Sequence, residues 1–115
     1  MPDPIPWFDG LPVAVTVTDQ DGTILDMNAC AREAFASYGG GQLVGKSVFE
    51  CHPGPARTKT LELYRQQQPN HYTVRKRATH KIIHQIPWFR GGAFAGYVEL
   101  SLVIPENLPH FDRDA

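Results

Sequence analysis

The chain lacks the features that mark several protein classes. Its 115 residues include only two cysteines, Cys30 and Cys51, without CxxC spacing, so we predict reduced thiols and neither a disulfide framework nor a metal site. No apolar run approaches the roughly 18–20 residues that span a bilayer. The N-terminus has no basic region followed by an apolar run, as a secretory signal would. We therefore expect a cytoplasmic protein that makes no membrane contact.

An excess of charge of either sign is also missing. Eleven Lys and Arg residues are balanced by twelve Asp and Glu, which gives a formal net charge of −1. The basic run Arg75-Lys76-Arg77 lies on an expected strand, where alternation sends Lys76 to the face opposite its neighbours. A nucleic-acid-binding surface needs a broader basic field. Direct contact with nucleic acid is therefore not expected.

One segment, residues 13–35, predicts two strands, a turn and a capped helix in order. Residues 13–18 alternate valine with alanine or threonine, which is the period of a half-buried strand. Asp21-Gly22 supplies the residue types that a tight hairpin turn needs. After a second short strand, Asn28 stands where its side-chain oxygen can cap a helix over about residues 29–35.

This segment resembles the start of a PAS domain, and the resemblance continues along nearly the whole chain. Residues 42–49, Gln-Leu-Val-Gly-Lys-Ser-Val-Phe, look like the family's hydrophobic-hydrophobic-Gly-Lys/Arg-x-hydrophobic segment. Cys51-His-Pro-Gly-Pro55 looks like the entry to its long helix, here over residues 56–68, and His84-Gln-Ile-Pro-Trp-Phe89 looks like a subgroup with a Pro-Trp-aromatic strand. Three closing strands are expected over residues 71–77, 80–89 and 93–104. The resemblance implies an α+β fold, a five-stranded antiparallel sheet flanked by short helices.

The expected organisation is one module with two short extensions. Residues 1–10 form a Pro-rich lead, residues 11–104 the sensor domain and residues 105–115 a polar tail. The length lies within the range of roughly 100–150 residues that is usual for single domains. Trp7 and Phe8 are too apolar to be left in water, so we expect them to pack over an open edge or the outer face of the sheet.

The resemblance implies a non-catalytic sensory and signalling module. It would bind a small ligand, form dimers or do both, and relay a conformational change to a separate kinase, cyclase or transcription regulator. A homodimer is predicted because Ile5, Trp7 and Phe8, with Tyr97 on the outer sheet face, could form a self-complementary apolar patch. One alternative is a purely structural dimerisation module with a filled core.

A weaker alternative is a small α+β enzyme. It would use His52, His84 and a carboxylate such as Glu99. No nucleophile, base and orienting group occur at a recognisable spacing, so the chain is not expected to be an enzyme.

The candidate ligand site lies between the sheet and the long helix. Alternation groups His84 with Trp88 on one face of the strand 80–89 and Leu100 with the apolar residues of the last strand, and these sets are predicted to form the cavity wall. A small, mostly apolar ligand would fit such a wall. The predicted binding residues are His52, Thr60, Tyr64, His84, Trp88 and Leu100. Structural roles remain open for several of them: capping or packing for His52, and core packing for His84 and Trp88.

No cofactor follows from the sequence. Flavin-binding light sensors of the family carry a reactive cysteine in Gly-x-Asn-Cys-Arg-Phe, and the corresponding Gly45-Lys-Ser-Val-Phe49 lacks it. Haem-binding members place their histidine ligand within the long helix, at a position that aligns with Thr60. A flavin adduct and helix-ligated haem are therefore disfavoured. His80 and His84 share a strand face but stand ~13 Å apart at ~3.3 Å per residue, too far to chelate one metal ion.

Overall fold

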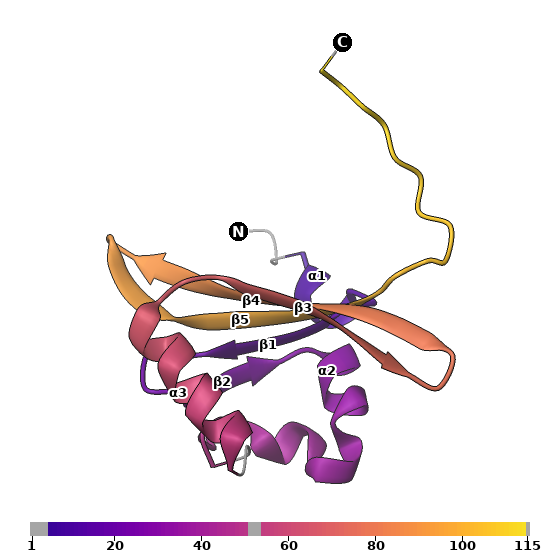
Figure 1. The fold of residues 1–115 in the computed structure, drawn as a ribbon. Helices are drawn as coiled ribbons and strands as arrows, with labels where there is room; N and C mark the ends of the chain where they lie inside the picture. The colour runs from indigo at the N-terminus through magenta and orange to yellow at the C-terminus, as the bar shows by residue number, and fades with distance from the viewer. Residues whose placement is uncertain (1–4, 51–53, 115) are drawn as a thin grey trace.

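The computed structural model describes residues 5–50 and 54–114, and its elements follow the predicted order (Figure 1). The helices and strands are α1 (Trp7–Gly10), β1 (Ala14–Thr18), β2 (Ile24–Met27), α2 (Ala29–Ala34), the short 3-10 segments η1 (Ala36–Tyr38) and η2 (Gly40–Leu43), α3 (Pro55–Gln66), β3 (Asn70–Lys76), β4 (Thr79–Arg90) and β5 (Ala93–Val103). The α+β class is confirmed, as are the capped helix, the long helix and the three closing strands.

All five strands pair antiparallel in one sheet of order β2-β1-β5-β4-β3. The predicted five-stranded antiparallel sheet is therefore confirmed, with β2 and β3 at its edges. In Figure 1, α2, α3 and the 3-10 segments lie on one side of the sheet, which we call the helix side. The opposite face is the outer side. The segment that follows β5, from residue 104 onward, extends away from the sheet toward the C-terminus.

Asn28 caps α2, as predicted, and also joins that helix to two other elements. Its Oδ1 accepts hydrogen bonds from the backbone amides of Ala31 and Val15, both at 3.0 Å. Its Nδ2 donates to the carbonyls of Phe8 (3.0 Å) and Val13 (2.7 Å). The residue is fully buried, and both polar atoms of its side chain have hydrogen-bond partners inside the protein, as buried polar groups require.

The buried core lies between β1, β2 and α2. Its cluster is formed by Ala14, Ile24, Met27, Ala31 and Leu43, against which Cys30, Phe35 and Val48 pack. Cys30 is a half-buried free thiol. Strand β3 and helix α3, in contrast, contain no buried residue. The core cluster is therefore formed by the N-terminal half of the chain.

The short helix α1 is anchored through its backbone and through Asp9. The Phe8 carbonyl accepts from Asn28, and Asp9 forms a salt bridge with Arg32 of α2 at 3.1 Å. This anchoring leaves Trp7 pointing outward with 62% of its surface exposed. The expectation that Trp7 is removed from water by packing over an edge or the outer face of the sheet is therefore wrong, while Phe8 is half-buried.

Helix α3 begins with Pro55 in its first turn, where a proline costs no intrahelical hydrogen bond. It ends at Gln66 and is followed by the C-cap residue Gln67, which adopts a left-handed backbone conformation with φ 57°. At 12 residues it is the longest helix described. Within residues 5–50 and 54–114, no helix has the length and hydropathy that a membrane crossing requires.

Candidate functional site

Tyr97 identifies which residues of β4 and β5 face the helices. Its phenol oxygen lies 2.7 Å from the Leu63 carbonyl near the end of α3 and 2.8 Å from the Gln68 carbonyl just beyond it, and its single proton is shared between these two acceptors. This side chain therefore points to the helix side. Alternation along β5 then places Glu99 and Ser101 on the same side. Their Cα partners on β4, Gln85 and Ile83, share that orientation. The helix side of the sheet therefore includes polar residues.

His84 and Leu100 lie on the outer side, opposite to the predicted cavity wall. The two residues are directly paired across β4 and β5, one position away from the helix-side residues on each strand. Grouping them with Tyr64 around one cavity was therefore wrong. The alternation within each strand is confirmed, but the face predicted to look toward the helices, which carries His84 and Leu100, is the outer face. Tyr97, expected on the outer face, is instead 4% exposed beneath α3.

Tyr64 belongs to an aromatic cluster between α3 and the sheet. Its ring centroid lies 4.6 Å from that of Tyr97, 5.0 Å from Phe49 and 6.3 Å from Phe94. Its hydroxyl shares a hydrogen bond with the Thr18 hydroxyl. Burial raises the pKa of Tyr64 to about 12, because the charged phenolate loses its hydration there. Aromatic rings thus occupy much of the space where a ligand cavity was expected.

The remaining predicted residues are scattered. Thr60 turns its hydroxyl back onto its own helix and donates to the Ala56 carbonyl at 2.9 Å. His52 lies outside the described residues. Trp88 is held by a hydrogen bond of 3.0 Å from its Nε1 to the Thr18 carbonyl. No pocket described for the structure brings Trp88 together with His84 and Leu100.

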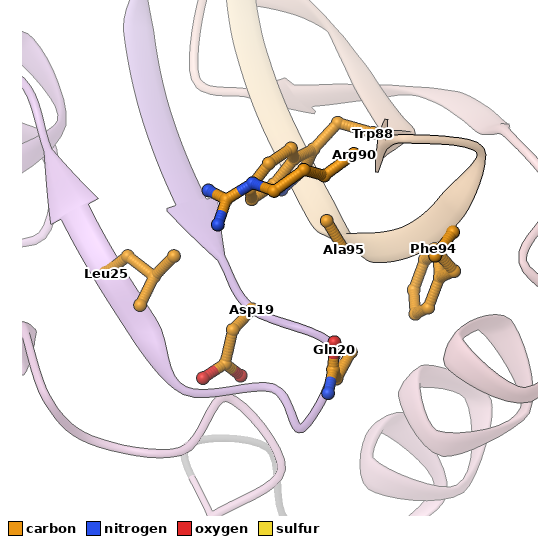
Figure 2. A pocket seen from close by; sticks show the side chains of 8 residues that line it. Asp19, Gln20, Leu25, Trp88, Arg90, Phe94 and Ala95 are labelled. Carbon is orange, nitrogen blue, oxygen red and sulfur yellow. The ribbon is translucent and has the colours of Figure 1, made fainter.

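Trp88 lines a recess at the end of the sheet, which we call the turn pocket (Figure 2). Arg90 extends across it, with its guanidinium carbon 5.4 Å from the Trp88 ring centroid. Such stacking of a cation on an indole is favourable. The recess measures about 270 Å³ and is lined by Asp19, Gln20, Leu25, Trp88, Arg90, Ala93, Phe94 and Ala95.

The acidic residue of the turn pocket has a structural role. Asp19 Oδ1 accepts hydrogen bonds from the backbone amides of Asp21 (2.9 Å) and Thr23 (3.0 Å), and so stabilises the β1–β2 turn around Gly22. This carboxylate is thus directed into the turn. The turn pocket offers a ligand mainly an open apolar surface beside Arg90.

A second recess, the helix-side groove, lies between α2 and the sheet. It measures about 190 Å³ and combines apolar, hydroxyl and charged groups. Its lining residues are Ala14, Thr16, Ala34, Phe35, Val74, Lys81, Ile83, Glu99 and Ser101. Pockets for small molecules commonly measure roughly 300–1,000 Å³, so the groove suits a ligand smaller than a typical drug.

A row of hydrogen-bonded side chains, the polar row, crosses three strands on the helix side. Gln85 Nε2 donates to Glu99 Oε2 at 3.1 Å, and Asn70 Nδ2 donates to Gln85 Oε1 at 2.8 Å. The row therefore connects the groove, which Glu99 lines, with edge strand β3. Sequence reasoning missed Gln85 and Asn70 because only the pairing of the strands aligns them.

The structure does not bring together the histidine and the carboxylate of the predicted enzyme alternative. His84 lies on the outer side and Glu99 on the helix side, and Glu99 pairs with Gln85 rather than with a histidine. The two side chains cannot act on one substrate from opposite faces of a sheet.

Comparisons with known proteins agree with this architecture. A family model described as the PAS fold matches residues 8–104. No curated protein matches the chain. Among solved structures, a C-terminal domain from Streptococcus mutans has a TM-score of 0.70 at 18% identity, covering 84% of this chain and 78% of that one.

Two further structures carry descriptive titles. The PAS domain of Bordetella pertussis BvgS has a TM-score of 0.64 at 22% identity, with coverage of 86% and 82%. The Aer2 receptor of Vibrio cholerae, described as a dual PAS-heme oxygen sensor, has a TM-score of 0.57 at 17% identity, with coverage of 81% and 95%. At these identities the similarity establishes the fold alone.

Proposed function

This chain belongs to the PAS fold family, and we propose that it is a non-catalytic sensory module that binds a small molecule in the helix-side groove. The observation that carries the proposal is the polar row Asn70–Gln85–Glu99, which leads from the groove to edge strand β3. Structural neighbours include the PAS domain of a histidine kinase and a receptor described as a PAS-heme oxygen sensor, which supports a role in signalling.

The lining of the groove defines the class of ligand. Glu99 favours a ligand with an amine or another hydrogen-bond donor, and Lys81 favours an acceptor at the other end. Phe35 and Ile83 provide apolar contact between these charges. The proposed ligand is therefore a small amphiphilic molecule that carries a donor group, more polar than the apolar ligand predicted from the sequence.

The polar row offers a route from binding to a change of shape. A donor on the ligand competes with Gln85 for the Glu99 carboxylate, and a reoriented Gln85 amide no longer holds Asn70. No side chain of β3 is buried, so this strand depends on its pairing with β4 and on such contacts. A ligand that favours the altered row shifts the population of β3 conformations, which a partner protein can detect.

The test is a ligand screen with a charge-removing variant. Purified protein is compared by native and denaturing mass spectrometry to find bound small molecules, and hits are titrated calorimetrically. Glu99→Gln keeps the shape of the side chain but removes its charge, and we expect at least about tenfold weaker binding of an amine ligand. Glu106→Gln, an identical change in the exposed C-terminal segment, serves as control and should bind normally. Equal affinity of both variants would contradict the groove as the site.

Homodimer formation is a further part of the proposal. Ile5 is 80% exposed and Trp7 62% exposed, which leaves apolar surface available for a second copy. Tyr97 does not contribute, since it is buried. A concentration-independent monomer in light scattering would contradict the dimer. We propose a cytoplasmic location and a separate signalling protein as partner.

A purely structural dimerisation module is the second candidate. The aromatic cluster around Tyr64, packed where the cavity was expected, favours it. It predicts a dimer from which no ligand is recovered and to which no ligand binds in the groove.

A further inference from the structure

Two histidines face each other on the outer side of the sheet, away from the helix-side groove. His71 of β3 and His84 of β4 are directly paired, and their Nδ1 atoms lie 2.8 Å apart. The ring centroids are 5.0 Å apart, with the rings inclined at 72°. Both side chains therefore direct the same nitrogen to one point between the strands.

This juxtaposition has the chemistry of a metal chelate. We propose that His71 and His84 bind one late first-row divalent metal ion, of which zinc is the tested example. Imidazole nitrogen suits zinc, copper and nickel ions, and copper should bind most tightly. At roughly 2.0–2.1 Å from each nitrogen, a tetrahedral zinc ion holds its two ligands about 3.3 Å apart. The rings need to separate by only about half an ångström from their present distance.

The surroundings leave the ion accessible but offer it few other ligands. His71 is exposed and His84 half-buried, while Leu100, the cross-strand partner of His84, and its neighbours Ile82 and Ile86 on β4 are apolar. Within the described residues, no group of three or more His, Cys, Asp or Glu side chains is placed to hold a metal. The chain thus supplies two ligands, and water completes the coordination.

A metal at this position would act on the least anchored part of the sheet. β3 has no buried residue, and the ion would join its side chains directly to β4. Metal that binds the folded chain more tightly than the unfolded chain raises stability by mass action. The pair lies on the sheet face opposite Glu99, so the proposal is independent of the ligand in the groove.

The experiment titrates the whole chain with zinc alone by calorimetry, in a buffer without thiols or chelators. We expect one zinc ion per chain, and His71→Ala or His84→Ala should each weaken binding at least about tenfold. The double variant should be little worse than either single variant, because one missing ligand already breaks the chelate. His80→Ala is the matched control. His80 shares the outer face of β4 with His84 but pairs with Arg75, and its loss should leave zinc affinity unchanged.

A second measurement needs no variant. Paramagnetic Cu²⁺ added to the wild-type protein at substoichiometric concentration should broaden the amide signals around His71 and His84 before those around His80 and His110. This readout holds even if a variant folds poorly. Absence of zinc binding by the wild-type chain, or binding that persists in both alanine variants, for instance through the thiols, overturns the proposal.

Discussion

At the β2–β1 end of the sheet the polar atoms of Asn28 are fully buried and paired, whereas at the β3 end every residue of the strand is exposed. The first end contains the core cluster of Ala14, Ile24 and Met27. The second is held by backbone pairing with β4 and by surface contacts such as Asn70–Gln85. Stability is therefore concentrated at one end of the sheet.

This difference suggests where the molecule can respond to a signal. Rearranging Asn28 would leave several buried polar groups without partners, which is costly. Rearranging the side chains of β3 exposes little apolar surface and can be offset by water. Both proposed binding sites involve the second end: the helix-side groove reaches it through the polar row, and the histidine pair lies on it.

The largest expected effect comes from Asn28. Asn28→Ala removes both acceptors and donors from buried partners, and we expect a loss of about 3 kcal/mol or more in the free energy of unfolding. At an ordinary N-cap, Asp replaces Asn without loss. Here a carboxylate cannot donate to the carbonyls of Phe8 and Val13, so Asn28→Asp should cost about 2 kcal/mol. Urea unfolding measures both losses. An Asp variant as stable as the wild type would show that Asn28 acts only as a helix cap and that its two donated hydrogen bonds do not contribute to stability.

Gly96 tests the contact that joins β5 to the end of β1. A Cβ at this position would collide with the Thr18 carbonyl oxygen, and the backbone has φ 143°. We expect Gly96→Ala to cost about 2–3 kcal/mol through steric conflict and backbone strain. Gly10→Ala, at a position with open space around it, is the matched control and should change stability little. Equal melting temperatures of the two variants would contradict the close approach.

One substitution made at both ends sharpens the comparison further. Thr18 is 4% exposed, and its hydroxyl accepts from the Tyr97 amide at 3.2 Å, whereas Thr73 lies exposed on β3. Thr18→Ala should cost about 1–2 kcal/mol and Thr73→Ala less than about 0.5 kcal/mol. Chemical denaturation of the two variants side by side measures the difference. Similar losses would show that β3 is as tightly held as β1.

The smallest expected effect near neutral pH is that of Tyr64, whose contribution to stability changes at high pH. Burial raises its folded-state pKa to about 12, against about 10 in an unfolded chain. Between these two pH values the folded chain keeps the Tyr64 proton, whereas the unfolded chain loses it. The contribution of Tyr64 to the free energy of unfolding is therefore fully present below about pH 10 and is lost as the pH rises to about 12. Tyr64→Phe should show a shallower alkaline decline and cost about 1 kcal/mol near pH 8. The decline should not vanish, because burial also raises the pKa values of Tyr72 and Tyr97. Parallel pH profiles of the two proteins would contradict the assignment.

Local chemistry made much of the fold predictable. The Asp21-Gly22 turn, the Asn28 cap and the strand alternation depend on residues close in sequence, and together with the order of motifs they were sufficient for the family. The sidedness of β4 and β5 was not predictable in this way. Both faces carry apolar residues, and the choice depends on where α3 packs, which involves the Tyr97 phenol and backbone carbonyls of distant residues.

The two sets of paired polar residues were missed for a related reason. His71 meets His84, and Asn70 meets Gln85, only because the turn between β3 and β4 has two residues, Arg77 and Ala78. A shift by one residue would send every side chain of β3 to the other face. Arg77 adopts φ 59°, a left-handed conformation that is usual for Gly or Asn and uncommon for Arg. The residue types of this turn therefore do not predict its length or the register of β3.

The exposure of β3 also has a consequence for the behaviour of the protein at high concentration. An edge strand presents unpaired backbone amides and carbonyls, which can recruit a strand from another molecule and start aggregation. Arg75, Lys76 and Arg77 place positive charge at the end of this edge, and two molecules that approach edge to edge repel each other there. The opposite edge, β2, is only four residues long and continues into an isolated bridge between Thr23 and Ser47. The basic run thus helps to keep the sheets of neighbouring molecules from merging.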